Sequence, residues 1–361
     1  MRKVIDQQKA SRNFLKQQTG KQLNGEKIRL AQFGTKHGHA KGVLEVMLTH
    51  SDVEVVGVWE PDKRRQDILR QSNDPVWEKI TWIEQPEQIL SDKTIVAISS
   101  EGANNESLDH TEAIIKAGKH VFYDKPAGEN FNQFKNVVEI AKLNKLHLQM
   151  GYMFRKHEGF TKISDWAKSG FLGNIFQIRA HMSTWIPEFN PNSENTSRKG
   201  VSHHKGGILY DLAGHMFDQI VWILGRPKKI TSFLQNTNSM TGKFKDNTLA
   251  VCEYPDTLAT VDISAIEPQP IARRYEVYGT EGSAVMEPFE PAKQIRLCLT
   301  EAKGGYRAGI NIVPISDEPR YVGTFSEFIK NIKGQSKPLR DYDHELLVQE
   351  TLLRATGNLS Y

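Results

Sequence analysis

Short apolar runs separated by helical patterns dominate the first 150 residues of the chain. The first run alternates between apolar and polar positions from Ile28 to Phe33 and stops at Gly34. Runs of about four to eight residues bounded by turn residues are typical of β-strands, whereas a period of about 3.6 indicates a helix. We therefore expect strands at 28–33, 53–59, 94–98, 120–123 and 146–150, and helices at 43–48, 110–117 and 131–144.

Strands that alternate with helices at this spacing predict a parallel sheet that helices cover on both faces. Such a sheet binds ligands at the carboxyl ends of its strands. The residues that directly follow each strand are therefore the first candidates for chemistry.

The pattern changes after residue 150. Consecutive strand-like segments joined by short turns, such as 279–282, favour a second, largely antiparallel sheet. We expect these strands at 175–185, 229–236, 248–254, 258–266, 273–279 and 283–287, with helices at 162–169, 208–224 and 343–356. The fold class is accordingly α/β, with a parallel-sheet domain followed by an α+β domain.

Length and composition fit two folded domains. Of the 361 residues, 38% are apolar and 25% are charged, which excludes a fibrous or low-complexity protein. We expect a basic, polar arm at 1–26, a first domain at 27–150 and a second at 151–361, whose last helix could pack back on the first domain. No apolar run approaches the roughly 18 residues of a membrane span.

The formal net charge of +4 is concentrated near the N-terminus. Residues 1–29 hold eight Lys or Arg side chains and two acidic ones, whereas the rest of the chain is slightly acidic. The basic balance therefore gives no reason to expect a nucleic-acid partner.

The arm contains Ser11–Lys16, which is similar to a twin-arginine export signal except that Asn13 takes the place of the second arginine. The next residues, 17–22, are polar, where a signal needs about 7–15 apolar residues. We therefore expect a cytoplasmic protein, with export as the alternative. Cys252 and Cys298 lack the spacing of a zinc site or a disulfide framework, in agreement with a reducing compartment.

The first predicted strand leads into the turn 34–39, which reads Gly-Thr-Lys-His-Gly-His. A strand, a glycine and a helix N-terminus form a phosphate site, because backbone N–H groups and the helix dipole face the anion. The turn holds Gly34 and Gly38 rather than the three glycines of GxGxxG, so a plain strand-to-helix turn is the alternative.

The second predicted strand ends at Glu60, 26 residues after Gly34. A carboxylate there can accept hydrogen bonds from a ribose and repels a 2′-phosphate, which favours NAD over NADP. Arg64 and Arg65 follow closely and leave NADP open. A solvated acid at the end of a strand is the other interpretation.

Two further groups could carry chemistry. Lys125 follows a predicted strand in Tyr123–Pro126, where it could position a hydroxyl group or lie as an ordinary surface lysine. Asp211 and His215 lie four residues apart, share a face of the helix at 208–224, and could handle protons near neutral pH. At this spacing alone, a surface contact is the more common outcome.

Together these segments resemble the Gfo/Idh/MocA family of NAD(P)-dependent oxidoreductases, which includes glucose–fructose oxidoreductase and inositol dehydrogenase. The resemblance begins at about residue 27 and implies a Rossmann fold, followed by a domain whose open sheet makes substrate and oligomer contacts. It rests on the glycine turn, 117–121, Asp124–Pro126 (Glu-Lys-Pro in the family), Gly206–Asp218 and 277–282.

The resemblance implies hydride transfer between a nicotinamide cofactor and a hydroxyl carbon of a sugar, polyol or cyclitol. His215 would take the hydroxyl proton, Asp211 would orient His215, and Lys125 would stabilise the developing alkoxide. The implied cofactor-binding residues are Gly34, Thr35, Lys36, Gly38, His39, Glu60, Ser99 and Lys125. The implied substrate-binding residues are Tyr152, Arg155, His203 and His204.

The chain departs from the family pattern at three places. Lys36 stands where a second glycine is usual, and its cation could meet the phosphates. Asp124 replaces the glutamate of Glu-Lys-Pro. The loop at 99–110 is longer than the usual turn and lies near the expected nicotinamide site.

No catalytic metal is expected from the histidines. They include His37, His39, His203, His204 and His215, yet none has the spacing of HExxH or of a zinc ribbon.

Two alternatives to a dehydrogenase stay open. One is a relative that cleaves glycosidic bonds through transient oxidation by NAD, and the other is a non-catalytic dinucleotide sensor. The chain keeps Lys125, Asp211 and His215, which a sensor would not need for proton transfer, so these residues count against the sensor. We expect a homodimer or homotetramer that acts on a small polyhydroxylated substrate and has neither a nucleic-acid nor a membrane partner.

Overall fold

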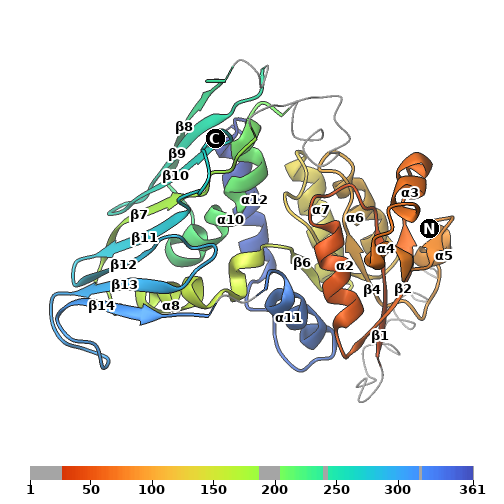
Figure 1. Ribbon diagram of the computed structural model, residues 1–361, viewed down its shortest axis with the longest axis horizontal. Coiled ribbons are helices and arrows are strands. Elements are labelled where there is room, and N and C mark those ends of the chain that lie inside the picture. Colours follow the sequence, from red (N-terminus) through yellow and green to blue (C-terminus); the bar gives the residue numbers. More distant parts are fainter. Residues whose placement is uncertain (1–26, 187–203, 239–242, 317–318, 361) are drawn as a thin grey trace, which may run out of the picture.

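The computed structural model describes residues 27–186, 204–238, 243–316 and 319–360. In these ranges the chain forms two sheets with helices between them (Figure 1). The predicted arm at 1–26 and His203 lie outside the described residues. Among the helices of these ranges, none is both long enough and apolar enough to cross a lipid bilayer.

The first sheet has six parallel strands in the order β3-β2-β1-β4-β5-β6, which confirms the predicted parallel sheet. From β1 the chain adds β2 and β3 on one side of the sheet. It then crosses to the other side of β1, where it forms β4, β5 and β6. Ligands bind to α/β sheets at such a switch point. The strands are β1 (Ile28–Phe33), β2 (Val53–Trp59), β3 (Trp82–Ile83), β4 (Ala97–Ser100), β5 (His120–Tyr123) and β6 (Leu148–Met150).

The first domain contains six α-helices among the described residues. Three of them begin at a side-chain cap, such as Asn130, whose side chain accepts the Gln133 N–H at the start of α7. In α2 the N-cap residue His39 provides no side-chain cap, so the positive end of this helix stays open toward the switch point. The helices are α2 (Ala40–Thr49), α3 (Lys63–Arg70), α4 (Pro75–Glu78), α5 (Glu87–Leu90), α6 (Ser107–Lys116) and α7 (Phe131–Leu143).

The second sheet has eight strands in the order β14-β13-β12-β11-β7-β10-β9-β8. All neighbours are antiparallel except β7 and β10, which confirms the predicted, mostly antiparallel sheet. The strands are β7 (Ile175–His181), β8 (Lys229–Gln235), β9 (Asn247–Glu253), β10 (Leu258–Ser264), β11 (Arg274–Gly279), β12 (Gly282–Met286), β13 (Gln294–Leu299) and β14 (Gly309–Pro314).

Helices α10 and α12 connect the two sheets, as Figure 1 shows. Helix α10 packs on β9 and β10, whereas α12 contacts α10 and also α7 and β6 of the first domain. Helix α11 contacts β5 and α2. The remaining elements are η1 (Met153–Lys156), α8 (Glu158–Lys168), α10 (Gly207–Leu224), α11 (Val322–Ile332) and α12 (Tyr342–Ala355).

Side chains of α12 hold the segment after β5 in place. The Gln349 amide accepts a hydrogen bond from the Ala127 N–H (3.2 Å) and donates one to the Gly128 carbonyl (2.6 Å). Glu345 forms a buried ion pair with Arg155, at 2.7 Å. The Gln349 contacts hold the segment after β5, which carries Lys125, against the second domain.

Candidate active site

The turn after β1 requires glycine at position 34. Gly34 has φ +82°, and a Cβ there would lie 2.8 Å from the backbone of Gly102 in the loop after β4. Its N–H donates to the Trp59 carbonyl (2.7 Å). The turn backbone is therefore held close to the ends of both neighbouring strands.

Thr35 forms hydrogen bonds with both Glu60 and Arg65. The Glu60 carboxylate, buried at the end of β2, accepts hydrogen bonds from the Thr35 N–H (2.8 Å) and hydroxyl (2.6 Å). The Arg65 guanidinium donates to the Thr35 hydroxyl oxygen (2.7 Å) and carbonyl (2.6 Å). The turn is thus rigid, and a negative charge lies beside it.

Two of the chain's departures from the family pattern meet in space. The Lys36 ammonium lies 3.1 Å from the Glu106 carboxylate, and Glu106 belongs to the long loop after β4. In the same region, the Ser99 hydroxyl donates to Glu101 (2.7 Å). Gly38 is exposed at the turn. The long loop therefore packs against the turn at 34–39.

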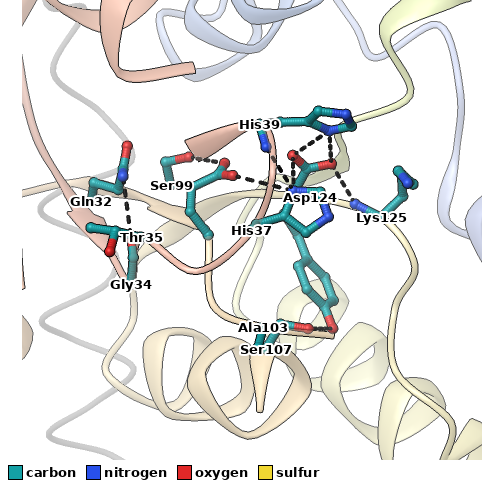
Figure 2. Close-up of polar contacts among 12 residues, drawn as sticks. Gln32, Gly34, Thr35, His37, His39, Ser99, Ala103, Ser107, Asp124 and Lys125 are labelled. Carbon is teal, nitrogen blue, oxygen red and sulfur yellow. Dashed lines mark hydrogen bonds and ion pairs between the residues drawn. The ribbon is translucent and has the colours of Figure 1, made fainter. Parts of the chain in front are cut away.

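His37, His39 and Asp124 form a compact cluster at the switch point (Figure 2). The Nδ1 atoms of His37 and His39 lie 2.9 and 3.0 Å from the same Asp124 oxygen, Oδ2. The other oxygen of Asp124, Oδ1, accepts the Lys125 N–H (2.7 Å). Glu101 lies at the edge of the cluster, with Oε2 4.0 Å from His37 Nδ1.

Burial and neighbouring charges shift the pKa values of the carboxyl groups in this cluster. Burial, together with the charge of Asp124, raises the pKa of Glu101 well above its usual range. Burial alone would also raise the pKa of Asp124, but the adjacent His37 and His39 hold it well below its usual value. The pKa values of the two carboxyl groups are thus shifted in opposite directions.

Lys125 and His215 extend the cluster toward α10. The Lys125 ammonium donates to the Asp211 carbonyl (2.7 Å) and carboxylate (3.2 Å), and only 3% of the lysine side chain is exposed. The His215 ring lies 6.5 Å from the His39 ring and 5.8 Å from the Tyr152 ring, between centroids. The two predicted halves of the site are therefore adjacent.

His215 is a buried, neutral imidazole. Burial, followed by the charge of Lys125, holds its pKa well below the usual value. Neither ring nitrogen has a hydrogen-bond partner among the described residues. Asp211 therefore contacts Lys125 rather than orienting His215, which differs from the sequence expectation. The spacing of four residues allowed either outcome, and the opposite charge of the lysine decides it.

The predicted substrate residues have different surroundings. Tyr152 is buried beside His215. Arg155 pairs with Asp218 and Glu345 at 2.7 Å each, so its guanidinium is committed to a buried ion-pair network. We therefore assign Arg155 a structural role instead of the predicted contact with substrate. His203 lies outside the described residues.

His204 is also buried. Its ring stacks on Tyr210 with 3.5 Å between centroids, and its Nδ1 accepts the Gly206 N–H (3.0 Å). Nε2 lies 3.9 Å from the Glu129 carboxylate. The ring thus anchors the start of α10.

Four residues at the site were not among the predicted site residues, namely His37, Asp124, Glu101 and Tyr321. Glu101 reaches the cluster because the His37 N–H donates to the Glu101 carbonyl (3.0 Å), which no local pattern indicates. Tyr321, at the N-cap of α11, has φ +69° and places its ring 5.3 Å from that of His39. A bulky residue with positive φ is uncommon and cannot be inferred from composition.

Family models match both halves of the chain. The oxidoreductase family with an NAD-binding Rossmann fold matches residues 28–152. The GFO/IDH/MocA C-terminal domain matches residues 160–285. The chain belongs to the Gfo/Idh/MocA family of oxidoreductases. The first domain of this Gfo/Idh/MocA chain is an NAD-binding Rossmann fold, and the glycine turn, the open end of α2 and Glu60 fit a bound dinucleotide.

Curated relatives of this Gfo/Idh/MocA chain are distant. The uncharacterized oxidoreductase YdgJ of Escherichia coli is 25% identical over 218 residues, which span 60% of this chain and 61% of YdgJ. Myo-inositol 2-dehydrogenase of Thermotoga maritima is 22% identical over 318 residues, 86% of this chain and 88% of that protein.

Solved structures share the fold at low identity. GenD2 from gentamicin A biosynthesis, in complex with NAD, has a TM-score of 0.73 and 18% identity, with 92% of this chain and 94% of that chain covered. The YPO2259 putative oxidoreductase of Yersinia pestis has a TM-score of 0.73 and 19% identity, with coverages of 92% and 95%.

Proposed function

We propose that the chain oxidises a hydroxyl carbon of a sugar, polyol or cyclitol and passes the hydride to NAD. The observation that carries this proposal is His215, a buried neutral imidazole with both nitrogens unpaired among the described residues, close to Lys125. A base in this state can take a proton at neutral pH. The polyhydroxyl substrate class rests on inositol dehydrogenases among the relatives.

Each residue of the proposed site has one task. A ring nitrogen of His215 accepts the proton of the substrate hydroxyl. The ammonium of Lys125 stabilises the negative charge that develops on the substrate oxygen. Asp211 positions Lys125 through the contacts at 2.7 and 3.2 Å. When bound, NAD supplies the chemistry that accepts the hydride.

We further propose that NAD is preferred over NADP. The Glu60 carboxylate lies beside the turn, and Arg65 is already engaged by Thr35. A 2′-phosphate would therefore meet a negative charge. Titration of the protein with each dinucleotide should give a lower Kd for NAD than for NADP. The Glu60→Gln variant should show a smaller difference between the two Kd values. Equal affinities in the unchanged protein would contradict this preference.

A substrate screen tests the reaction. We expect inositols, sugars or polyols to produce reduced cofactor, followed by its absorbance. His215→Ala and Lys125→Ala should each lower kcat by about 10²–10⁴-fold, because they remove proton transfer and charge stabilisation. His215→Ala should leave the Kd of NAD nearly unchanged. The matched control is His147→Gln, outside the proposed site, which should keep full activity.

The same screen can contradict the proposal. Full activity in both alanine variants would remove Lys125 and His215 from the mechanism. Release of free sugar from a glycoside without net formation of reduced cofactor would indicate glycoside cleavage instead. Tight NAD binding with no turnover on any polyhydroxyl compound would favour the sensor.

A further inference from the structure

Three potential ligand atoms converge at the switch point. They are Nδ1 of His37, Nδ1 of His39 and one carboxylate oxygen of Asp124, and all lie within 4.8 Å of one another. Both Nδ1 atoms approach Oδ2 of Asp124, at 2.9 and 3.0 Å. The side chains of His37 and Asp124 are 4% and 1% exposed, so bulk water does not solvate these groups.

Glu101 adds an independent observation. Its carboxyl group is fully buried, and Oε2 has no hydrogen-bond partner among the described residues. That atom lies 4.0 Å from His37 Nδ1, on the edge of the cluster. A buried polar atom without a partner costs free energy and in native proteins usually has a partner such as water or an ion.

We propose that His37, His39, Asp124 and Glu101 bind one divalent first-row metal ion of the zinc class. Two imidazoles and two carboxylates suit Zn²⁺, whereas Mg²⁺ prefers an octahedral set of oxygens. Around a tetrahedral Zn²⁺ with bonds of about 2.0–2.1 Å, neighbouring ligand atoms lie about 3.3 Å apart. The observed spacings of 2.9, 3.0 and 4.0 Å bracket that value.

Charge balance supports a dication. As metal ligands, the carboxylates of Asp124 and Glu101 would bring two negative charges, whereas the two imidazoles would bring none. A divalent ion neutralises this set and gives Oε2 of Glu101 a partner.

The proposed ion would connect the turn, the long loop and β5. His37 and His39 lie in the turn, Glu101 follows β4, and Asp124 follows β5. Asp124 also accepts the N–H of Lys125, so the ion would fix the backbone that carries this lysine. The inference stands on these contacts and does not require the proposed hydride transfer.

Metal binding can be measured directly. The full chain without an affinity tag is treated with a chelator, exchanged into buffer and titrated with Co²⁺, which reports through its visible absorption. We expect about one Co²⁺ per chain, displaced by Zn²⁺. His39→Gln and Asp124→Asn should each weaken Co²⁺ binding at least tenfold. His50→Gln, which changes a histidine elsewhere, is the matched control and should bind as the unchanged protein does.

The outcomes separate the two proposals. Less than a tenth of an equivalent of Co²⁺ in the unchanged, folded protein would overturn the metal site, and so would equal binding by both cluster variants. NAD binding is measured on the same samples. A chain that binds Co²⁺ at the cluster but binds no NAD would keep the metal site and refute the proposed reaction.

Discussion

Burial lowers the pKa of His204, His215 and His120, because the fold removes these rings from water. For His204 the effect is explicit, since burial, followed by the charge of Lys205, lowers its pKa to about 4. Its pKa in the unfolded chain is near 6.5. Between these values only the unfolded chain takes up the proton, so this histidine reduces stability as the pH falls.

Acid should therefore destabilise the protein through His204. The free energy of unfolding begins to fall near pH 6.5, and the fall levels off near pH 4. His204 alone should account for a loss on the order of 2–3 kcal/mol. Urea unfolding at pH 7 and pH 4.5 measures the difference. His204→Gln cannot take up this proton, so its stability should fall less between the two pH values. An identical fall in both proteins would show that His204 does not contribute.

At the residue scale, the catalytic candidates were easier to predict than their contacts. Lys125, Asp211 and His215 follow from the resemblance, and the structure brings them together. The partner of Asp211 could not be predicted, because the choice between His215 and Lys125 depends on how two segments dock. No sequence pattern indicated that Glu101 belongs to the site, because its position beside His37 depends on the path of the loop after β4.

At the element scale, the turn between β1 and α2 determines the shape of the dinucleotide site. Gly34 combines a positive φ with the close approach of Gly102, so no other residue fits without moving backbone. Gly42, in α2, has no neighbour within 4 Å of an added Cβ. The two glycines therefore form a matched pair for substitution.

Gly34→Ala should lower the stability by about 1–3 kcal/mol and weaken NAD binding at least tenfold, because the turn must shift away from Gly102. Gly42→Ala should leave NAD binding unchanged and stabilise the helix by up to about 1 kcal/mol. Thermal unfolding and NAD titration of both variants measure these effects. If Gly34→Ala bound NAD normally, the turn would not be the dinucleotide site.

Elements with a clear apolar period were predicted well, and those with a weak one were not. In β14, Ile310 and Ile312 are exposed and only Val313 is buried, so the strand shows little alternation that marks a core face. Helix α11 has buried Phe325, Phe328 and Ile329 at helical spacing. Its glycine and β-branched residues weaken that signal.

At the scale of the whole molecule, Arg155 joins three elements of the second domain, and its partner Glu345 reaches the first domain by accepting the Met150 N–H (3.3 Å). Arg155 lies in η1, pairs with Asp218 on α10 and with Glu345 on α12, and is fully enclosed. His344 also contacts the Asp218 carboxylate, at 2.9 Å. A buried charge that loses one partner destabilises the fold more than a surface pair does.

Glu345→Ala should lower the free energy of unfolding by about 3–5 kcal/mol, because Arg155 would keep one carboxylate where it now has two. Urea unfolding followed by far-UV circular dichroism measures this loss. Glu84→Ala is the control, since that side chain is 57% exposed and pairs with Lys63 at the surface. The control should unfold at the same midpoint as the unchanged protein, and an equal shift in both would refute the role of the Arg155 pair.

The Arg155–Glu345 pair also bears on how the chain folds as it is made. The two residues are 190 positions apart, so at about 5–20 residues per second the ribosome needs roughly 10–40 s to supply Glu345 after Arg155 has emerged. Asp218 arrives much earlier and can pair first. Until α12 emerges, the surfaces of α7 and β6 that it covers stay open to chaperones, and the nascent protein completes its two-domain core only with that helix.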